Sequence, residues 1–148
     1  AAVLAFVASV IAVGVSAYSV RFSRFAKERW WERKAEAYSR IVEALAGLVY
    51  YHEEHYDAEL ESRSIPEDRR RQIDEYWRTG YIELKKATAA GPFLISAEAE
   101  AALAQMWRDR GKGVHPGDWF GRIESDYTTA RDGLKAVVAA AKKDLAVT

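Results

Sequence analysis

The chain has 148 residues, which is enough for one domain with a modest core but not for two. Its 22 lysines and arginines equal its 22 aspartates and glutamates, so no net charge favours binding of nucleic acid or of acidic substrates. It contains no cysteine, which excludes disulfide bonds, thiolate catalysis and zinc–cysteine sites.

The first twenty residues carry no charged side chain, and Gly14 is the only poor helix former among them. At about 1.5 Å per residue, a helix of this length spans about 30 Å, the hydrocarbon thickness of a bilayer. The sequence Val-Ser-Ala at 15–17 also resembles the cleavage site of a secretory signal. Because the basic residues follow the apolar run instead of preceding it, we predict a transmembrane helix over 1–20.

This predicted helix carries two rows of small side chains spaced four residues apart. Such rows let helices approach closely in lipid, although alanine is common throughout this chain and the pattern also arises by chance. We predict contacts with other membrane-protein subunits through Ala5, Ser9, Ala8, Ala12 and Ser16.

A basic and aromatic segment follows at 21–37, which we call the collar. Between 21 and 34 it has six basic residues and two acidic ones, a net charge of +4. Positive charge beside a spanning helix stays in the cytoplasm, so we predict a single-pass protein of the bacterial inner membrane with a cytoplasmic C-terminal domain. The residues predicted to contact lipid at the membrane interface are Tyr18, Arg21, Phe22, Arg24, Phe25 and Lys27.

The collar also holds the adjacent pair Trp30 and Trp31. Along an unbroken helix the pair lies about 15 Å beyond the apolar run, which is farther than lipid headgroups extend. We therefore predict that protein covers both rings. Trp31 leads a helical stripe through Tyr38 and Ile41 and is expected in the core, whereas Trp30 points about 100° away and is expected to bind a partner.

The rest of the chain predicts an all-α domain at 38–148, a small antiparallel bundle of about four helices. The first helix continues to about Glu61, and "ESRSIPEDRRR" at 61–71 breaks it. A second helix is expected to stop at Gly91-Pro92, with Ser96 capping a third and Asp118 capping the last. The last helix predicts an apolar seam of Ile123, Tyr127, Ala130, Leu134, Val137 and Ala141.

One cluster has the residue types of a metal site. His52, His55 and Glu59 share a helix face at spacings of three and four. The Glu-x-x-His pattern of di-metal bundles and the HExxH pattern of zinc enzymes are both absent. We predict no metal, no cofactor and no catalytic residues, and we interpret His52 as a half-buried, hydrogen-bonded side chain.

Three stretches carry a resemblance to a known kind of protein: "WERKAEAYSRIVEAL" at 31–45, "FLISAEAEAAL" at 93–103 and "AAKKDL" at 140–145. They are similar to a loose class of bacterial single-pass proteins. In that class an apolar N-terminal helix precedes a Trp-x-x-(Lys/Arg)-x-x-Ala-Tyr run and a helical domain. The resemblance implies no activity and no catalytic residues.

These observations favour a non-enzymatic accessory or scaffolding subunit that binds partner proteins within a larger membrane complex, for example a respiratory or photosynthetic one. The alternative is a self-associating effector or sensor of a bacterial stress or defence system. The expected partners are membrane lipids and other membrane-protein subunits, and not nucleic acid.

Overall fold

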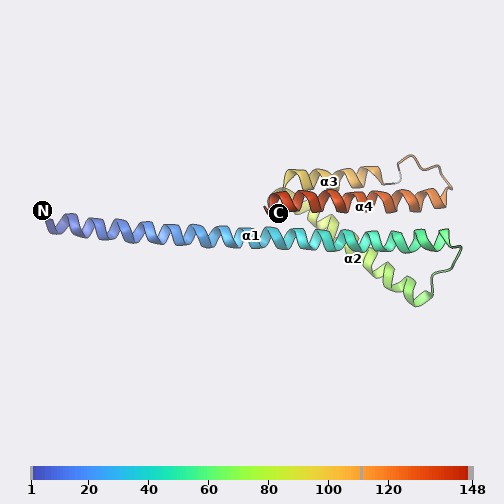
Figure 1. Cartoon of the computed structure of the whole chain (residues 1–148), viewed down its shortest axis with the longest axis horizontal. Coiled ribbons are helices and arrows are strands. Elements are labelled where there is room, and N and C mark those ends of the chain that lie inside the picture. The colour runs from blue at the N-terminus through green and yellow to red at the C-terminus, as the bar shows by residue number, and fades with distance from the viewer. Residues whose placement is uncertain (1, 111, 147–148) are drawn as a thin grey trace. The chain divides into compact units, whose positions relative to one another are not determined.

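The structure is a computed structural model. It describes the backbone of residues 2–110 and 112–146, and the side chains of residues 27–89, 93–110 and 112–146. Within the described backbone all regular structure is helical, in four helices (Figure 1): α1 (Ala2–Leu60), α2 (Glu67–Leu94), α3 (Ala97–Asp109) and α4 (Trp119–Asp144). The predicted all-α class with about four helices is confirmed.

The chain divides into two compact units, residues 1–34 and residues 35–148. The predicted membrane span at 1–20 lies outside the residues whose side chains are described, as do its small-residue rows. Among the residues that the structure describes with their side chains, no helix is both long and apolar enough to cross a bilayer. The transmembrane helix therefore stays a prediction, and so do the proposed domain boundaries.

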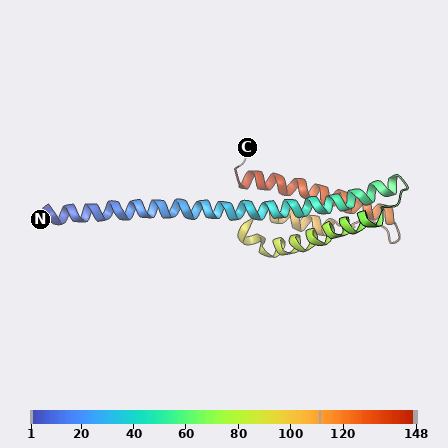
Figure 2. The same ribbon diagram turned by 90° about the horizontal axis from the view of Figure 1, so that it is seen from below.

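In the second unit, residues 35–60 of α1 and the three later helices run alternately in opposite directions (Figures 1 and 2). At one end, the Tyr38 hydroxyl donates to the Asp144 carboxylate at 2.7 Å and accepts the backbone N–H of Ser96 at 2.9 Å. At the opposite end, the Trp119 indole N–H donates to Glu59 at 3.0 Å. The first hydrogen bond holds Tyr38 of α1 beside the end of α4, the second holds it beside Ser96, and the third holds the end of α1 beside the start of α4.

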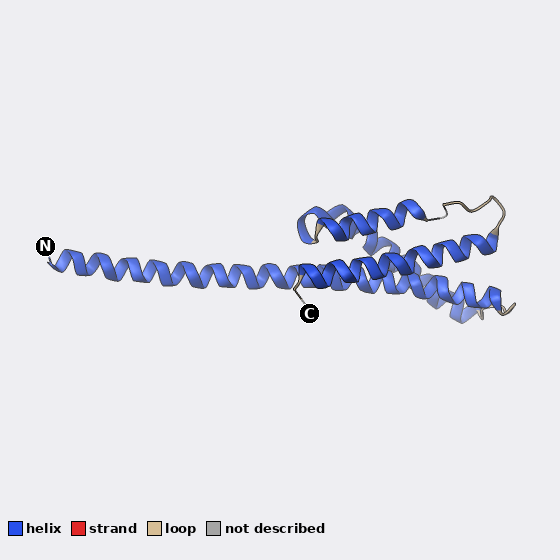
Figure 3. Ribbon diagram, turned by 45° about the horizontal axis from the view of Figure 1, so that its top comes forward, coloured by secondary structure: helices blue, strands red, loops and turns tan. Residues whose placement is uncertain are grey.

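The core of this unit follows the apolar stripe predicted for α1. Leu45 is fully buried, and α2, α3 and α4 each add apolar side chains to the same core. Figure 3, coloured by secondary structure, shows helices and loops and no strand in the described residues. A smaller cluster of Ala58, Ile65 and Ile73 fills the end near the α1–α2 turn. The main core consists of Tyr38, Ile41, Ala44, Leu45, Leu48, Leu84, Ile95, Ala99, Leu103, Met106, Val137, Ala140 and Ala141.

Most of the predicted helix boundaries agree with the structure. Ser62 turns the chain with φ +52°, and the Arg70 N–H donates to the Pro66 carbonyl, which is the first helical hydrogen bond of α2. The side chains of Ser96 and Asp118 accept the N–H groups of Ala99 and Gly121, so both predicted N-caps are confirmed.

The predicted end of the second helix at Gly91-Pro92 is wrong, because α2 continues to Leu94. A proline loses its own N–H bond and strains the preceding turn, but the helix can continue beyond it when tertiary packing compensates. Here the following residue, Ile95, belongs to the core and Ser96 is held by Tyr38.

Candidate interaction surfaces and the buried polar cluster

The collar is exposed on all sides over residues 27–33. Every residue from Lys27 to Arg33 is exposed, and Trp30 and Trp31 are each 50% accessible to solvent. Large aromatic rings dominate the energetics of protein interfaces when they become buried. Two turns of helix that display two such rings are therefore a candidate partner surface.

The expectation that Trp31 belongs to the core is wrong, since half of its surface is accessible. The buried stripe of α1 instead begins two helical turns further on, at Tyr38. Tyr38 closes the end of the bundle through its bonds to Ser96 and Asp144. Of the predicted interface residues, Lys27 is exposed, and Tyr18, Arg21, Phe22, Arg24 and Phe25 lie outside the described side chains.

A stack of three aromatic rings joins α1 to α4 on the outside of the bundle. The Tyr56 ring lies between those of Phe120 and Tyr127, with centroids 5.5 Å away on each side and interplanar angles of 23° and 22°. The Arg131 guanidinium lies over the ring of Tyr127, 5.4 Å from its centroid. Such offset stacking stabilises the α1–α4 contact beyond simple burial of area.

Carboxylates surround this stack. Glu53 accepts the Tyr127 hydroxyl at 3.2 Å, and Glu59 accepts the Trp119 indole N–H at 3.0 Å. At the same end, Trp119 is 62% exposed and Leu60 is 58% exposed. We call this surface the aromatic–acidic face; it comprises Glu53, Tyr56, Asp57, Glu59, Leu60, Trp119, Phe120 and Tyr127.

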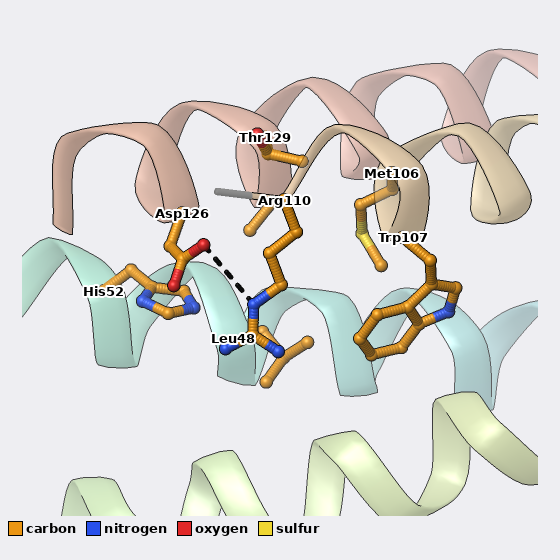
Figure 4. A pocket seen from close by; sticks show the side chains of 8 residues that line it. Leu48, His52, Met106, Trp107, Arg110, Asp126 and Thr129 are labelled. Atoms are coloured by element: carbon orange, nitrogen blue, oxygen red, sulfur yellow. Dashed lines mark hydrogen bonds and ion pairs between the residues drawn. The ribbon is translucent and has the colours of Figure 1, made fainter. Parts of the chain in front are cut away.

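A buried polar cluster lies on the inner side of the same helices (Figure 4). Asp126 of α4 accepts the Nε–H groups of Arg110 and Arg122, each at 3.4 Å. His52 of α1 lies against this carboxylate, and both His52 and Asp126 are only 7% exposed. The two arginines neutralise a carboxylate that would otherwise be costly to bury.

The pKa of His52 is lowered to about 4, mainly by burial; Asp126 opposes this shift, and the nearby Arg110 and His55 add to it. His52 is therefore neutral in the folded protein at neutral pH, as expected for a histidine taken out of water. Protonation requires either partial unfolding or a low pH.

Acidification should destabilise the bundle through His52. Its pKa is lower in the folded state than the ordinary value of 6.5, so its contribution to stability is complete above about pH 6.5 and is lost as the pH falls toward 4. Between about pH 7 and pH 4.5 we expect wild type to lose about 2 kcal/mol more than His52→Gln, measured by urea unfolding in detergent. The exposed loop histidine offers a control, because His115→Gln should keep the wild-type pH dependence. Equal pH dependence in wild type and His52→Gln would contradict the burial argument.

The three candidate metal ligands do not converge. His52 faces Asp126 of α4, whereas His55 packs against Tyr51, with ring centroids 4.6 Å apart, and its Nε2 is buried without a hydrogen-bond partner. Glu59 instead accepts the indole N–H of Trp119. Among the described residues, no group of three metal-ligating side chains is arranged to hold an ion. The metal hypothesis therefore gains no support from their positions.

The cavity beside the buried cluster is about 10 Å³, lined by Leu48, Met106, Trp107 and Arg110 together with His52 and Asp126 (Figure 4). That is about the room one water molecule needs, and a small-molecule site is usually many times larger. The cluster is best explained as structural pairing between α1, the end of α3 and α4.

Neither the aromatic stack nor the pairing of Asp126 was predicted from the sequence. Tyr56 and Phe120 are 64 positions apart, and no local spacing relates them. The available signal was compositional, since residues 53–61 hold five acidic side chains and no lysine or arginine. The comparisons with family models, with characterised proteins and with solved structures gave no significant match.

Proposed function

We propose that the chain is a non-enzymatic, protein-binding helical module held at the bacterial inner membrane. The apolar run at 1–20 anchors it, the collar lies beyond the lipid, and the bundle lies in the cytoplasm. In this proposal it serves as an accessory or scaffolding subunit of a larger membrane complex.

The observation that carries the proposal is the exposure of Trp30 and Trp31 on a helical segment that is exposed all around. A small domain buries only half of each of these tryptophans, whereas an interface that covers the exposed half gains a large apolar anchor from each. The alternating Glu28, Arg29, Glu32 and Arg33 around them supply the polar rim that such interfaces carry.

The membrane location rests on the sequence pattern. A charge-free run long enough to span the hydrocarbon is followed by a segment of net charge +4, which favours retention of the flank in the cytoplasm. Contact of Lys27 and its basic neighbours with anionic headgroups would hold the collar close to the lipid surface.

The test is purification of the full chain from the membrane fraction in mild detergent, followed by mass spectrometry of the proteins that co-purify. Trp30→Ala should reduce the amount of co-purified subunit at least about tenfold, as loss of an interface anchor does, while leaving thermal unfolding close to wild type. Phe93→Ala, which removes an exposed aromatic ring that lies outside both the collar and the aromatic–acidic face, is the control and should retain that subunit.

Unchanged co-purification for both Trp30→Ala and Trp31→Ala would reject the collar as the binding surface. Recovery of the chain in the soluble fraction would reject the anchor. A pure homo-oligomer, with no foreign subunit, would instead favour the self-associating effector or sensor.

A further inference from the structure

We propose that the aromatic–acidic face is a second docking surface, which binds a basic segment of a partner protein through arginine or lysine side chains. The inference rests on the proposed protein-binding function, but it concerns a surface within residues 35–148 that shares no residue with the collar.

The first argument is the charge of the face. Of the five carboxylates at 53–61, Glu54 is paired with Arg69 at 3.3 Å and Glu61 with Arg63 at 2.6 Å. Within the described side chains, Glu53, Asp57 and Glu59 have no ion-pair partner, and two of them accept only from the neutral donors of Tyr127 and Trp119. A guanidinium or ammonium group would give these carboxylates a donor of opposite charge, and such ion-paired hydrogen bonds are stronger than those from neutral donors.

The second argument is the exposed aromatic surface between those carboxylates. Phe120 is 38% exposed and Trp119 is more exposed still, so flat ring surface is accessible beside Glu59. Arg131 already lies over the ring of Tyr127, which demonstrates that a cation packs on this stack in the folded protein. Arginine is suited to both contacts at once, because it stacks on rings and donates several hydrogen bonds to carboxylates.

The same charge argues against other occupants. An anionic lipid surface or a nucleic acid would be repelled by three unpaired carboxylates. A second copy bound through the same face would oppose like charges across a two-fold axis. A basic protein segment satisfies both the carboxylates and the rings.

The experiment uses the full chain in non-ionic detergent and a fluorescent amphipathic peptide with four arginines on one helical side and leucines on the other. Fluorescence anisotropy should report binding that weakens with added salt, and a matched peptide with glutamate in place of arginine should not bind. The combined variant Glu53→Gln, Asp57→Asn, Glu59→Gln should weaken the arginine peptide at least about tenfold.

Two controls locate the effect on this face. The combined variant Glu43→Gln, Glu67→Gln, Glu75→Gln removes the same number of exposed acidic charges elsewhere on the bundle and should keep wild-type binding. Trp119→Ala should weaken the peptide, whereas Phe93→Ala, which removes a more exposed ring at the end of α2, should not.

If both charge variants weakened binding of the arginine peptide equally, the effect would depend on net charge alone and the proposal would be overturned. Binding of the glutamate peptide as tightly as the arginine peptide would overturn it too. Wild type could also self-associate, with the basic segment 21–34 of a second copy bound to this face. If the combined variant of Glu53, Asp57 and Glu59 abolished such self-association, the proposal of a partner protein would be overturned. Trp30→Ala should not alter peptide binding, so failure of the collar and failure of this face remain distinguishable.

Discussion

Leu45→Ala should lower the free energy of unfolding by about 2–5 kcal/mol, the usual cost of emptying a fully buried leucine site. Leu45 has no solvent-accessible surface and lies in the main core, where α1 meets the other helices of the bundle. The lost contacts leave a cavity that the surrounding rigid helices fill only in part. Urea unfolding monitored by circular dichroism, with the chain in detergent, measures the change.

The matched control is Leu60→Ala, the same substitution on the same helix at a site that is largely exposed. Surface substitutions of this kind change stability by about 0.5 kcal/mol or less. A similar loss of unfolding free energy for both variants would contradict the placement of Leu45 in the core of the bundle.

Gly80→Ala should destabilise the bundle by about 1–3 kcal/mol, although alanine is the better helix former. A Cβ at Gly80 would lie 2.7 Å from the backbone carbonyl oxygen of Ala44 on α1. A backbone atom cannot rotate away as a side chain can, so α1 and α2 would have to separate. Thermal unfolding and urea unfolding should both report the loss.

Two other helical glycines provide a graded comparison. A Cβ at Gly133 would meet the Met106 sulfur at 2.8 Å, but a methionine side chain can change rotamer, so Gly133→Ala should cost less than Gly80→Ala. A Cβ at Gly47 would meet its nearest atom, the Tyr76 carbonyl oxygen, at an ordinary 3.5 Å. Gly47→Ala should therefore be neutral or stabilising by up to about 1 kcal/mol. Any order in which Gly80→Ala is not the most destabilising would contradict the close approach of α1 and α2.

The local elements could be predicted because their causes are local. The helical stripe from Tyr38 to Leu48 follows from hydrophobic periodicity alone. The caps at Ser96 and Asp118 follow from the ability of short oxygen-bearing side chains to accept the first free N–H groups of a helix. The break before α2 follows from Pro66 and the acidic residues after it.

The prediction for Trp31 failed because periodicity gives the direction in which a side chain points, but it does not say whether a neighbouring helix reaches far enough to cover that side chain. Trp31 continues the stripe in angle, yet the buried part of that stripe ends at Tyr38. The prediction of where α2 ends failed for a related reason, since the tertiary contacts of Ile95 and Ser96 outweighed a local helix breaker.

The sequence by itself determined the all-α class, the main helix boundaries and the caps, because each depends on interactions between residues a few positions apart. The tertiary structure alone decided which polar and aromatic side chains meet. Asp126 is paired with Arg110 and placed against His52, and Tyr56 is stacked between Phe120 and Tyr127, only because antiparallel packing brings α1 beside α4. Such pairings depend on the register between helices, which is set by the packing of the whole core. No spacing within the sequence indicates that register.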